Sequence, residues 1–111
     1  MITRTAIFEG RLKDGCEARF FTQLHERLVP LWHQFPHASN VRLLRTMKAD
    51  ADAPPILMIQ QIDYPSMAAL EEAIASPVRT QARAVTIELM EMFEGRFYHV
   101  LSEGSDLERV G

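Results

Sequence analysis

The sequence predicts a single α+β domain in which one four-stranded antiparallel sheet carries its helices on one face. Its 111 residues are enough for one hydrophobic core. Segments that favour strands and helices follow one another in the order β-α-β-β-α-β, which is the order of the ferredoxin-like sandwich. Right-handed crossovers in the two β-α-β halves place both helical layers on the same side of the sheet.

Composition limits the classes of partner. The chain has 12 Lys and Arg against 15 Asp and Glu and shows no basic stripe, so we expect no nucleic-acid partner. No apolar stretch is long enough to span a membrane, and residues 1–4 lack an export signal. We therefore expect a cytoplasmic protein without a membrane partner. Cys16 is the single cysteine, and no glycine-rich phosphate loop is present, so we expect no disulfide, metal or bound cofactor.

The first third of the chain is predicted to form a strand and a kinked helix. Residues 2–9 are rich in β-branched and aromatic side chains and predict a strand. Asp14, three residues before Glu17, forms a variant of the capping box and predicts a helix start. Pro30 predicts a kink in the turn before it, and Pro36 predicts the helix end. Apolar side chains recur along this helix at helical spacing: Phe21, Leu24, Leu28, Leu31 and Phe35.

The rest of the chain is predicted to complete the sheet. The segments are, in order, a strand over residues 40–48, a strand over 55–64, a helix over 66–75, a second helix from 77 and a last strand over 96–101. Ser76 followed by Pro77 predicts the start of that second helix, and Gly95 predicts its end. The domain is thus expected to cover residues 1–103, with 104–111 as a C-terminal tail.

The strand over residues 55–64 predicts a homodimer, because its apolar side chains point both ways. Ile56, Met58 and Ile62 point to one face of the sheet, and Leu57 and Ile59 point to the other. Helices cover only one face. The other face, on the order of 300 Å², would match the largest apolar patch that a monomer exposes. We expect a second copy of the chain to cover it, burying roughly 1,600 Å² in all.

Two motifs in the chain resemble the EthD-like family of the dimeric α/β-barrel superfamily. One runs from Tyr64 to Pro77, with Ser-Met, Ala-Leu, Ala and Ser-Pro in the family's order. The other runs from His25 to Leu31 and is followed by Phe-Pro at 35–36. With the strand order, the resemblance covers about residues 2–101. It implies a homodimeric barrel with a small hydrophobic pocket, in a superfamily of aromatic polyketide monooxygenases, cyclases, haem-degrading enzymes and proteins of unknown activity.

His25 and Trp32 are the first candidate site residues. They lie seven residues apart, so on a regular helix they share a face and could line a cavity between helix and sheet. There His25 is a candidate catalytic base and Trp32 a ligand-binding residue, because histidine exchanges protons near neutral pH. The alternative is structural: a histidine at the edge of the core and a tryptophan packed within it.

His99 is the second candidate catalytic residue. It lies in the last strand on the same face as Phe97 and Leu101, opposite Tyr98. A polar group among apolar neighbours needs a hydrogen-bond partner. That partner could be a ligand or haem iron, or else a neighbouring strand or the second subunit.

Four polar residues interrupt otherwise apolar strands: Arg4, Arg45, Gln60 and Gln61. A buried polar atom without a partner costs about 1 to 3 kcal/mol, so some of them are expected to face a wet cleft. Arg45 and Gln60 are the predicted ligand-binding members. The alternative for Arg45, and for Arg42 beside it, is an edge strand where charge blocks sheet-to-sheet aggregation.

The sequence therefore predicts a small homodimeric protein that binds a hydrophobic, aromatic or carbonyl-bearing organic molecule. As an enzyme it would be a cofactor-independent monooxygenase, cyclase or isomerase of a catabolic or biosynthetic pathway. Two alternatives stay open. One is a non-catalytic ligand-binding or accessory protein, and the other is a haem-binding member of the superfamily with His99 or His25 as axial ligand.

Overall fold

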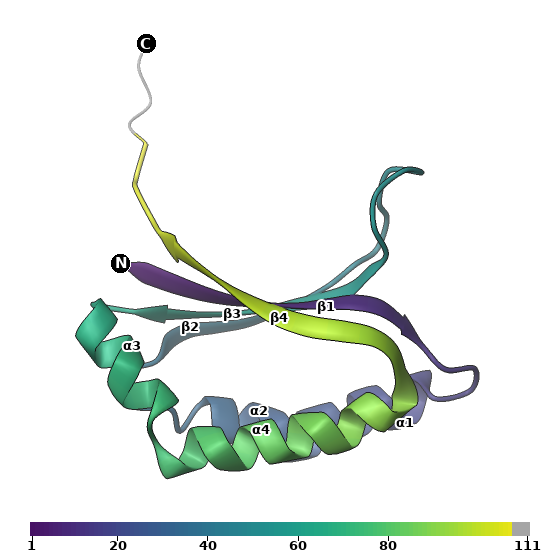
Figure 1. Ribbon diagram of the computed structural model, residues 1–111, viewed down its shortest axis with the longest axis horizontal. Coiled ribbons are helices and arrows are strands. Elements are labelled where there is room, and N and C mark those ends of the chain that lie inside the picture. The colour runs from purple at the N-terminus through teal and green to yellow at the C-terminus, as the bar shows by residue number, and fades with distance from the viewer. Residues whose placement is uncertain (108–111) are drawn as a thin grey trace.

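The computed structural model describes residues 1–107, in which one sheet carries its helices on a single face (Figure 1). Its strands are neighbours in the order β2-β3-β1-β4, and each adjacent pair is antiparallel. The strands are β1 (Ile2–Leu12), β2 (Ser39–Arg45), β3 (Ile56–Tyr64) and β4 (Phe93–Glu103). The helices are α1 (Glu17–Gln23), η1 (Leu24–Leu28), α2 (Val29–Trp32), α3 (Met67–Ile74), α4 (Pro77–Leu89) and η2 (Met90–Met92). The predicted ferredoxin-like order and one-sided helical layer are confirmed.

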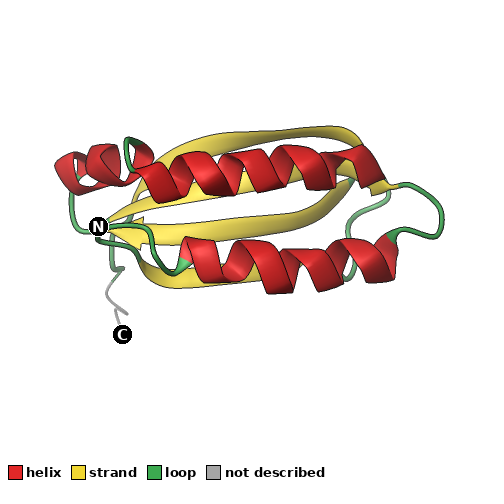
Figure 2. Ribbon diagram, turned by 90° about the horizontal axis from the view of Figure 1, so that it is seen from below, coloured by secondary structure: helices red, strands yellow, loops and turns green. Residues whose placement is uncertain are grey.

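The core lies between the sheet and two helical rods that run side by side beneath it (Figure 2). One rod consists of α1, η1 and α2, and the other is α4. Alternate strand residues point into this layer, as the pairing of Ala6 with Gln60 and of Phe8 with Met58 requires. The largest fully buried side chains come from both layers: Phe20, Leu24, Leu28, Met58, Ile62, Tyr64, Leu70 and Leu89.

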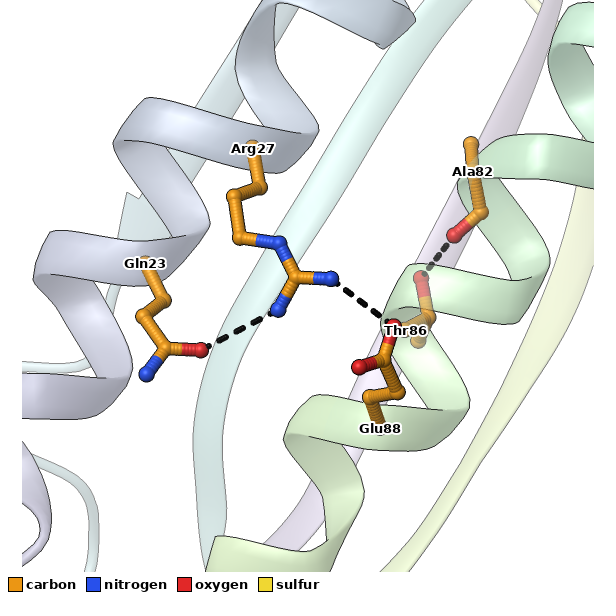
Figure 3. A network of polar contacts seen from close by, with 5 residues as sticks. All are labelled: Gln23, Arg27, Ala82, Thr86 and Glu88. Carbon is orange, nitrogen blue, oxygen red and sulfur yellow. Dashed lines mark hydrogen bonds and ion pairs between the residues drawn. The ribbon is translucent and has the colours of Figure 1, made fainter.

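Polar contacts join the two rods at their solvent side. The Arg27 guanidinium donates to Glu88 Oε2 on α4 at 2.8 Å and to Gln23 Oε1 one turn back at 3.2 Å (Figure 3). Both Arg27 and Glu88 are exposed, so this pair adds little to stability. Within residues 1–107, none of the helices is long and apolar enough to cross a membrane.

A π-helical turn, η1, lies directly before Pro30, where the sequence predicted a kink. The Val29 N–H donates to the Leu24 carbonyl, five residues back. Proline has no N–H and its ring clashes with the preceding turn, and the wider turn absorbs this mismatch. Because η1 has more residues per turn than an α-helix, side chains seven residues apart across it no longer share a face.

Asp14 does not cap the first helix, so that prediction is wrong. α1 begins at Glu17, and the side chain of the N-cap residue Cys16 makes no capping hydrogen bond. Asp14 lies instead in a tight turn that ends with the Cys16 N–H donating to the Lys13 carbonyl. The caps of the later helices follow the sequence: Ser66 Oγ accepts from the Ala69 N–H, and Ser76 Oγ accepts from the Arg79 N–H.

Gly95 does not end a helix, which corrects a second prediction. α4 ends at Leu89, the short η2 follows, and Gly95 lies inside β4 directly opposite Gly10 of β1. The two glycines have φ of +147° and +140°. A Cβ at Gly95 would lie 2.1 Å from the Glu9 carbonyl oxygen, so glycine here permits close approach of two strands.

The first and last strands are longer than the sequence predicted. β1 continues to Leu12, and β4 runs from Phe93 to Glu103. The expected C-terminal tail begins directly after β4, where the Gly104 N–H donates to the Met1 carbonyl. Residues 108–111 of that tail lie outside the described residues. The division into a domain over 1–103 and a tail stays a prediction.

Candidate functional site

A pocket opens between the sheet and the helical layer, lined by residues of β1, β3, β4, α2 and α4. The pocket is small and partly open to solvent. Aromatic side chains line the pocket from both the sheet and the helical layer. Phe8 and Phe97 stack across neighbouring strands with ring centroids 5.6 Å apart, while Trp32 and Phe35 close the pocket from the helical side. An aromatic wall of this kind suits a flat apolar molecule.

The floor of the pocket is one row of side chains across three strands. Gln60 of β3 and His99 of β4 both lie opposite Ala6 of β1, so all three point to the helices. Alanine leaves a hollow between the two larger side chains. The sequence separates these residues widely, and only the strand order β3-β1-β4 brings them together.

Gln60 is the buried polar residue of the described chain, with 6% of its surface exposed. Within residues 1–107 its side-chain amide makes no hydrogen bond. Every fully buried side-chain nitrogen or oxygen atom of these residues does have a partner, so the Gln60 amide is not fully buried. The amide therefore faces the free space of the pocket. An amide in this position can donate to or accept from a ligand.

Three arginines surround His99: Arg4 from β1, and Arg79 and Arg83 from α4. The imidazole lies at the pocket mouth and packs edge-on against Phe97, with ring centroids 6.0 Å apart. Burial of its inner side, followed by repulsion from Arg4, Arg79 and Arg83, lowers the pKa of His99 from 6.5 to about 4. His99 is therefore neutral at pH 7 and can accept a proton or a hydrogen bond.

Protein stability is expected to fall as the pH is lowered from 6.5 towards 4, because unfolded His99 takes up a proton that the folded protein rejects. His99→Gln should flatten this part of the pH profile, as measured by urea unfolding at a series of pH values. His25→Gln, a change at an exposed histidine, is the matched control and should leave the fall of stability between pH 6.5 and 4 unchanged. An unaltered profile in His99→Gln would contradict the assignment.

The structure brings three of the five predicted site residues together. Trp32, Gln60 and His99 line the pocket. His25 lies exposed on η1 outside it, so the expected shared face with Trp32 is wrong, because the π-helical turn lies between them. The catalytic role assigned to His25 stays a prediction. A haem-binding function would have to use His99, since it is the candidate axial ligand that lines the pocket.

Arg45 lies apart from this pocket, on the edge strand β2. Its guanidinium donates to Glu17 Oε1 at 3.0 Å and lies 3.6 Å above the centre of the Phe21 ring. These contacts line a shallower hollow near the start of α1. Arg45 therefore lies on an edge strand, as the alternative for this residue expected. Gln61 points to the opposite face of the sheet, where it donates to Thr5 Oγ1.

Sequence reasoning missed the contribution of α4. Four residues of this helix line the pocket: Arg79, Ala82, Arg83 and Thr86. The last three lie three, four and seven residues after Arg79, so all four form one stripe along the helix. A helical projection of the sequence would have shown this stripe. The Thr86 hydroxyl already donates to the Ala82 carbonyl at 2.8 Å (Figure 3), so the two arginines are the free polar groups of the stripe.

No metal-binding cluster is visible in the described part of the chain: residues 1–107 bring no three His, Cys, Asp or Glu side chains together. The pocket's polar groups are guanidinium, amide, imidazole and hydroxyl groups. They are suited to hydrogen bonding with an organic molecule.

No family model matches the chain, and no curated protein matches it. Solved structures do share its fold. An EthD family protein from Bacillus halodurans is 13% identical with a TM-score of 0.73, covering 95% of this chain and 99% of that one. SnoaB, a cofactor-independent oxygenase from Streptomyces nogalater, is 17% identical with a TM-score of 0.63, covering 96% and 94%.

A DABB family protein with a ferredoxin-like fold, from Mesorhizobium loti, is 14% identical with a TM-score of 0.64 and covers 95% of this chain and 97% of that one. At these identities the likeness shows the fold. The chain has the ferredoxin-like α+β fold that an EthD family protein also has, as the resemblance in its motifs implied. The fold by itself does not define the chemistry.

Proposed function

We propose that the protein is a cytoplasmic, EthD-like homodimer that binds a hydrophobic aromatic or carbonyl-bearing organic molecule in the pocket between α2, α4 and the sheet. The observation that carries this proposal is Gln60, a buried amide without a partner that faces an aromatic-walled space. Because this amide is open to the pocket, a carbonyl or hydroxyl of a ligand can replace solvent as its hydrogen-bond partner.

The arrangement also supports chemistry on such a ligand. The neutral His99 imidazole can accept a proton from a ligand hydroxyl, or from a carbon next to a ligand carbonyl. The Gln60 amide, across Ala6, can donate to the oxygen on which the negative charge then develops. Proton removal of this kind could begin a cofactor-independent oxygenation, cyclisation or isomerisation. The similar structure of SnoaB, named a cofactor-independent oxygenase, supports this direction.

Tryptophan fluorescence tests the binding proposal. Trp32 is the single tryptophan, so aromatic ketones such as 1-tetralone should change its emission saturably. Gln60→Leu should weaken that binding about tenfold, because it removes one hydrogen bond. Gln61→Leu is the matched control: it makes the same change on the opposite sheet face and should leave the affinity unaltered. A Trp32 emission that stays constant across ketones, quinones, hydroquinones and aromatic acids would contradict the proposal.

The outer sheet face supports the homodimer. Within residues 1–107 the helices lie only on the other side (Figure 1), and Ile7 and its partner Ile59 point outwards at the centre of this face. Leu44 and Val100 flank them with 38% and 43% of their surfaces exposed. These four residues form the outer apolar patch. We infer that a second copy packs on it, since an apolar sheet face of this kind is stable in water when another sheet covers it.

A further inference from the structure

The pocket holds three arginines without a counter-ion. Three other arginines have one, since Arg27 pairs with Glu88, Arg45 with Glu17 and Arg96 with Glu9, whereas Arg11, Arg19 and Arg42 make no ion pair within residues 1–107. The three pocket arginines, Arg4, Arg79 and Arg83, make no ion pair and no side-chain hydrogen bond within residues 1–107. No carboxylate of the described residues 1–107 lines the pocket either.

This grouping of positive charge is unfavourable unless something neutralises it. Burial, and then repulsion from Arg79, lower the pKa of Arg4, which shows that the cations act on one another. The chain as a whole carries more acidic than basic residues, with a formal charge of −3, so acidic partners are abundant elsewhere on its surface. The three guanidinium groups therefore give this partly open pocket a positive potential.

We propose that the ligand of this pocket is an organic anion, an aromatic carboxylate whose ring lies against Trp32 and Phe97 and whose carboxylate is held by Arg79 and Arg83. This rests on the proposed function and narrows it to a class of ligand. The guanidinium fork matches the two oxygens of a carboxylate, and the aromatic wall beside it matches an aryl group.

The surroundings of the arginines favour a carboxylate over a phosphate group. Phosphate sites commonly use free backbone N–H groups at a helix N-terminus. At the start of α4 the Arg79 N–H is already bonded to Ser76 Oγ at 3.3 Å, and Pro77 has no N–H to offer. Within residues 1–107, the free donors at the pocket include the side-chain guanidinium groups, the Gln60 amide and the Trp32 indole N–H.

Neutralising the arginines has a consequence for His99. The charged groups that face its ring are Arg4 from the neighbouring strand and Arg79 and Arg83 from the helix packed above it. A bound anion offsets their repulsion and raises the pKa of His99 again. Binding of the anion below about pH 6.5 should therefore take up a proton at His99, and binding of a neutral ligand should not.

Isothermal titration calorimetry with three matched probes tests the proposal: 1-naphthoate, the neutral 1-naphthamide and the cationic 1-naphthylmethylammonium. We expect naphthoate to bind at least about tenfold more tightly than the amide, and the cation to give no saturable heat. Arg79→Gln and Arg83→Gln should each weaken naphthoate binding about 10- to 100-fold and weaken amide binding clearly less, because the amide has no charge to lose a partner. At pH 6, buffers of different ionisation enthalpy should show proton uptake that His99→Gln abolishes.

Controls separate this inference from the proposed function. Arg11→Gln removes an exposed β1 arginine outside the pocket and should leave naphthoate binding unaltered, and Arg83→Lys should restore part of the affinity lost in Arg83→Gln. Equal binding of amide and carboxylate, or equal losses in Arg11→Gln and Arg79→Gln, would overturn the anion assignment and leave the proposed function standing. Absence of binding by all three probes and by aromatic ketones would overturn both.

Discussion

The Ile59→Asp variant is expected to be a folded monomer, whereas Met58→Asp is expected not to fold. The two residues are neighbours in β3 and point to opposite faces of the sheet. Ile59 is part of the outer apolar patch, so a carboxylate there is exposed in the monomer but buried and unpaired in a dimer. Met58 is 0% exposed, and a charge at this core position costs more than about 4 kcal/mol.

Sedimentation equilibrium and circular dichroism measure these two outcomes. The unchanged protein should sediment near twice its chain mass of 12.7 kDa, and Ile59→Asp near that mass with a native spectrum. Ile87→Asp is the matched control, because Ile87 is 54% exposed on α4, on the helical side. It should leave the dimer intact. An unchanged protein that is monomeric at micromolar concentration, or a dimeric Ile59→Asp, would rule out assembly through this face.

Gly95→Ala is expected to destabilise the protein by about 2 to 6 kcal/mol, the sum of backbone strain and overpacking. The residue has φ +147°, and its Cβ would lie 2.1 Å from the Glu9 carbonyl oxygen. Neither β1 nor β4 can move away without breaking the long ladder that joins them. The free energy of unfolding in urea measures the effect.

Gly15→Ala is the control for the strand pair. Gly15 also has a positive φ, +79°, but a Cβ there would meet nothing within 4 Å. Its replacement should therefore cost only the strain of the backbone conformation, about 1 kcal/mol. If Gly95→Ala and Gly15→Ala destabilise the protein equally, close approach of the two strands is not what requires glycine at 95.

Local patterns in the sequence predicted most of the fold. Alternation in β3 assigned Met58 and Ile59 to opposite faces, and the Ser76-Pro77 pair marked the start of α4. The failures were at positions where a local signal has two meanings. Gly95 suits a helix end as well as a close strand pair, and only the pairing with Gly10 decides between them.

The candidate site was harder to predict, because strands distant in sequence build it. Gln60 and His99 could be recognised as polar residues on apolar strands, but their position on either side of Ala6 depends on the strand order. His25 was misplaced since a seven-residue spacing presumes a regular helix, and η1 is π-helical. Arg79 and Arg83 gave no local sign of function, because an exposed helix surface commonly carries arginines.

A crystal structure of the protein with bound 1-naphthoate tests the central claim, that the space between α2, α4 and the sheet is a ligand site. We expect one ligand in each pocket, with its ring against Trp32 and its carboxylate within hydrogen-bond distance of Arg79 or Arg83. A pocket filled by the protein's own side chains, with naphthoate absent or bound only on the outer sheet face, would contradict it.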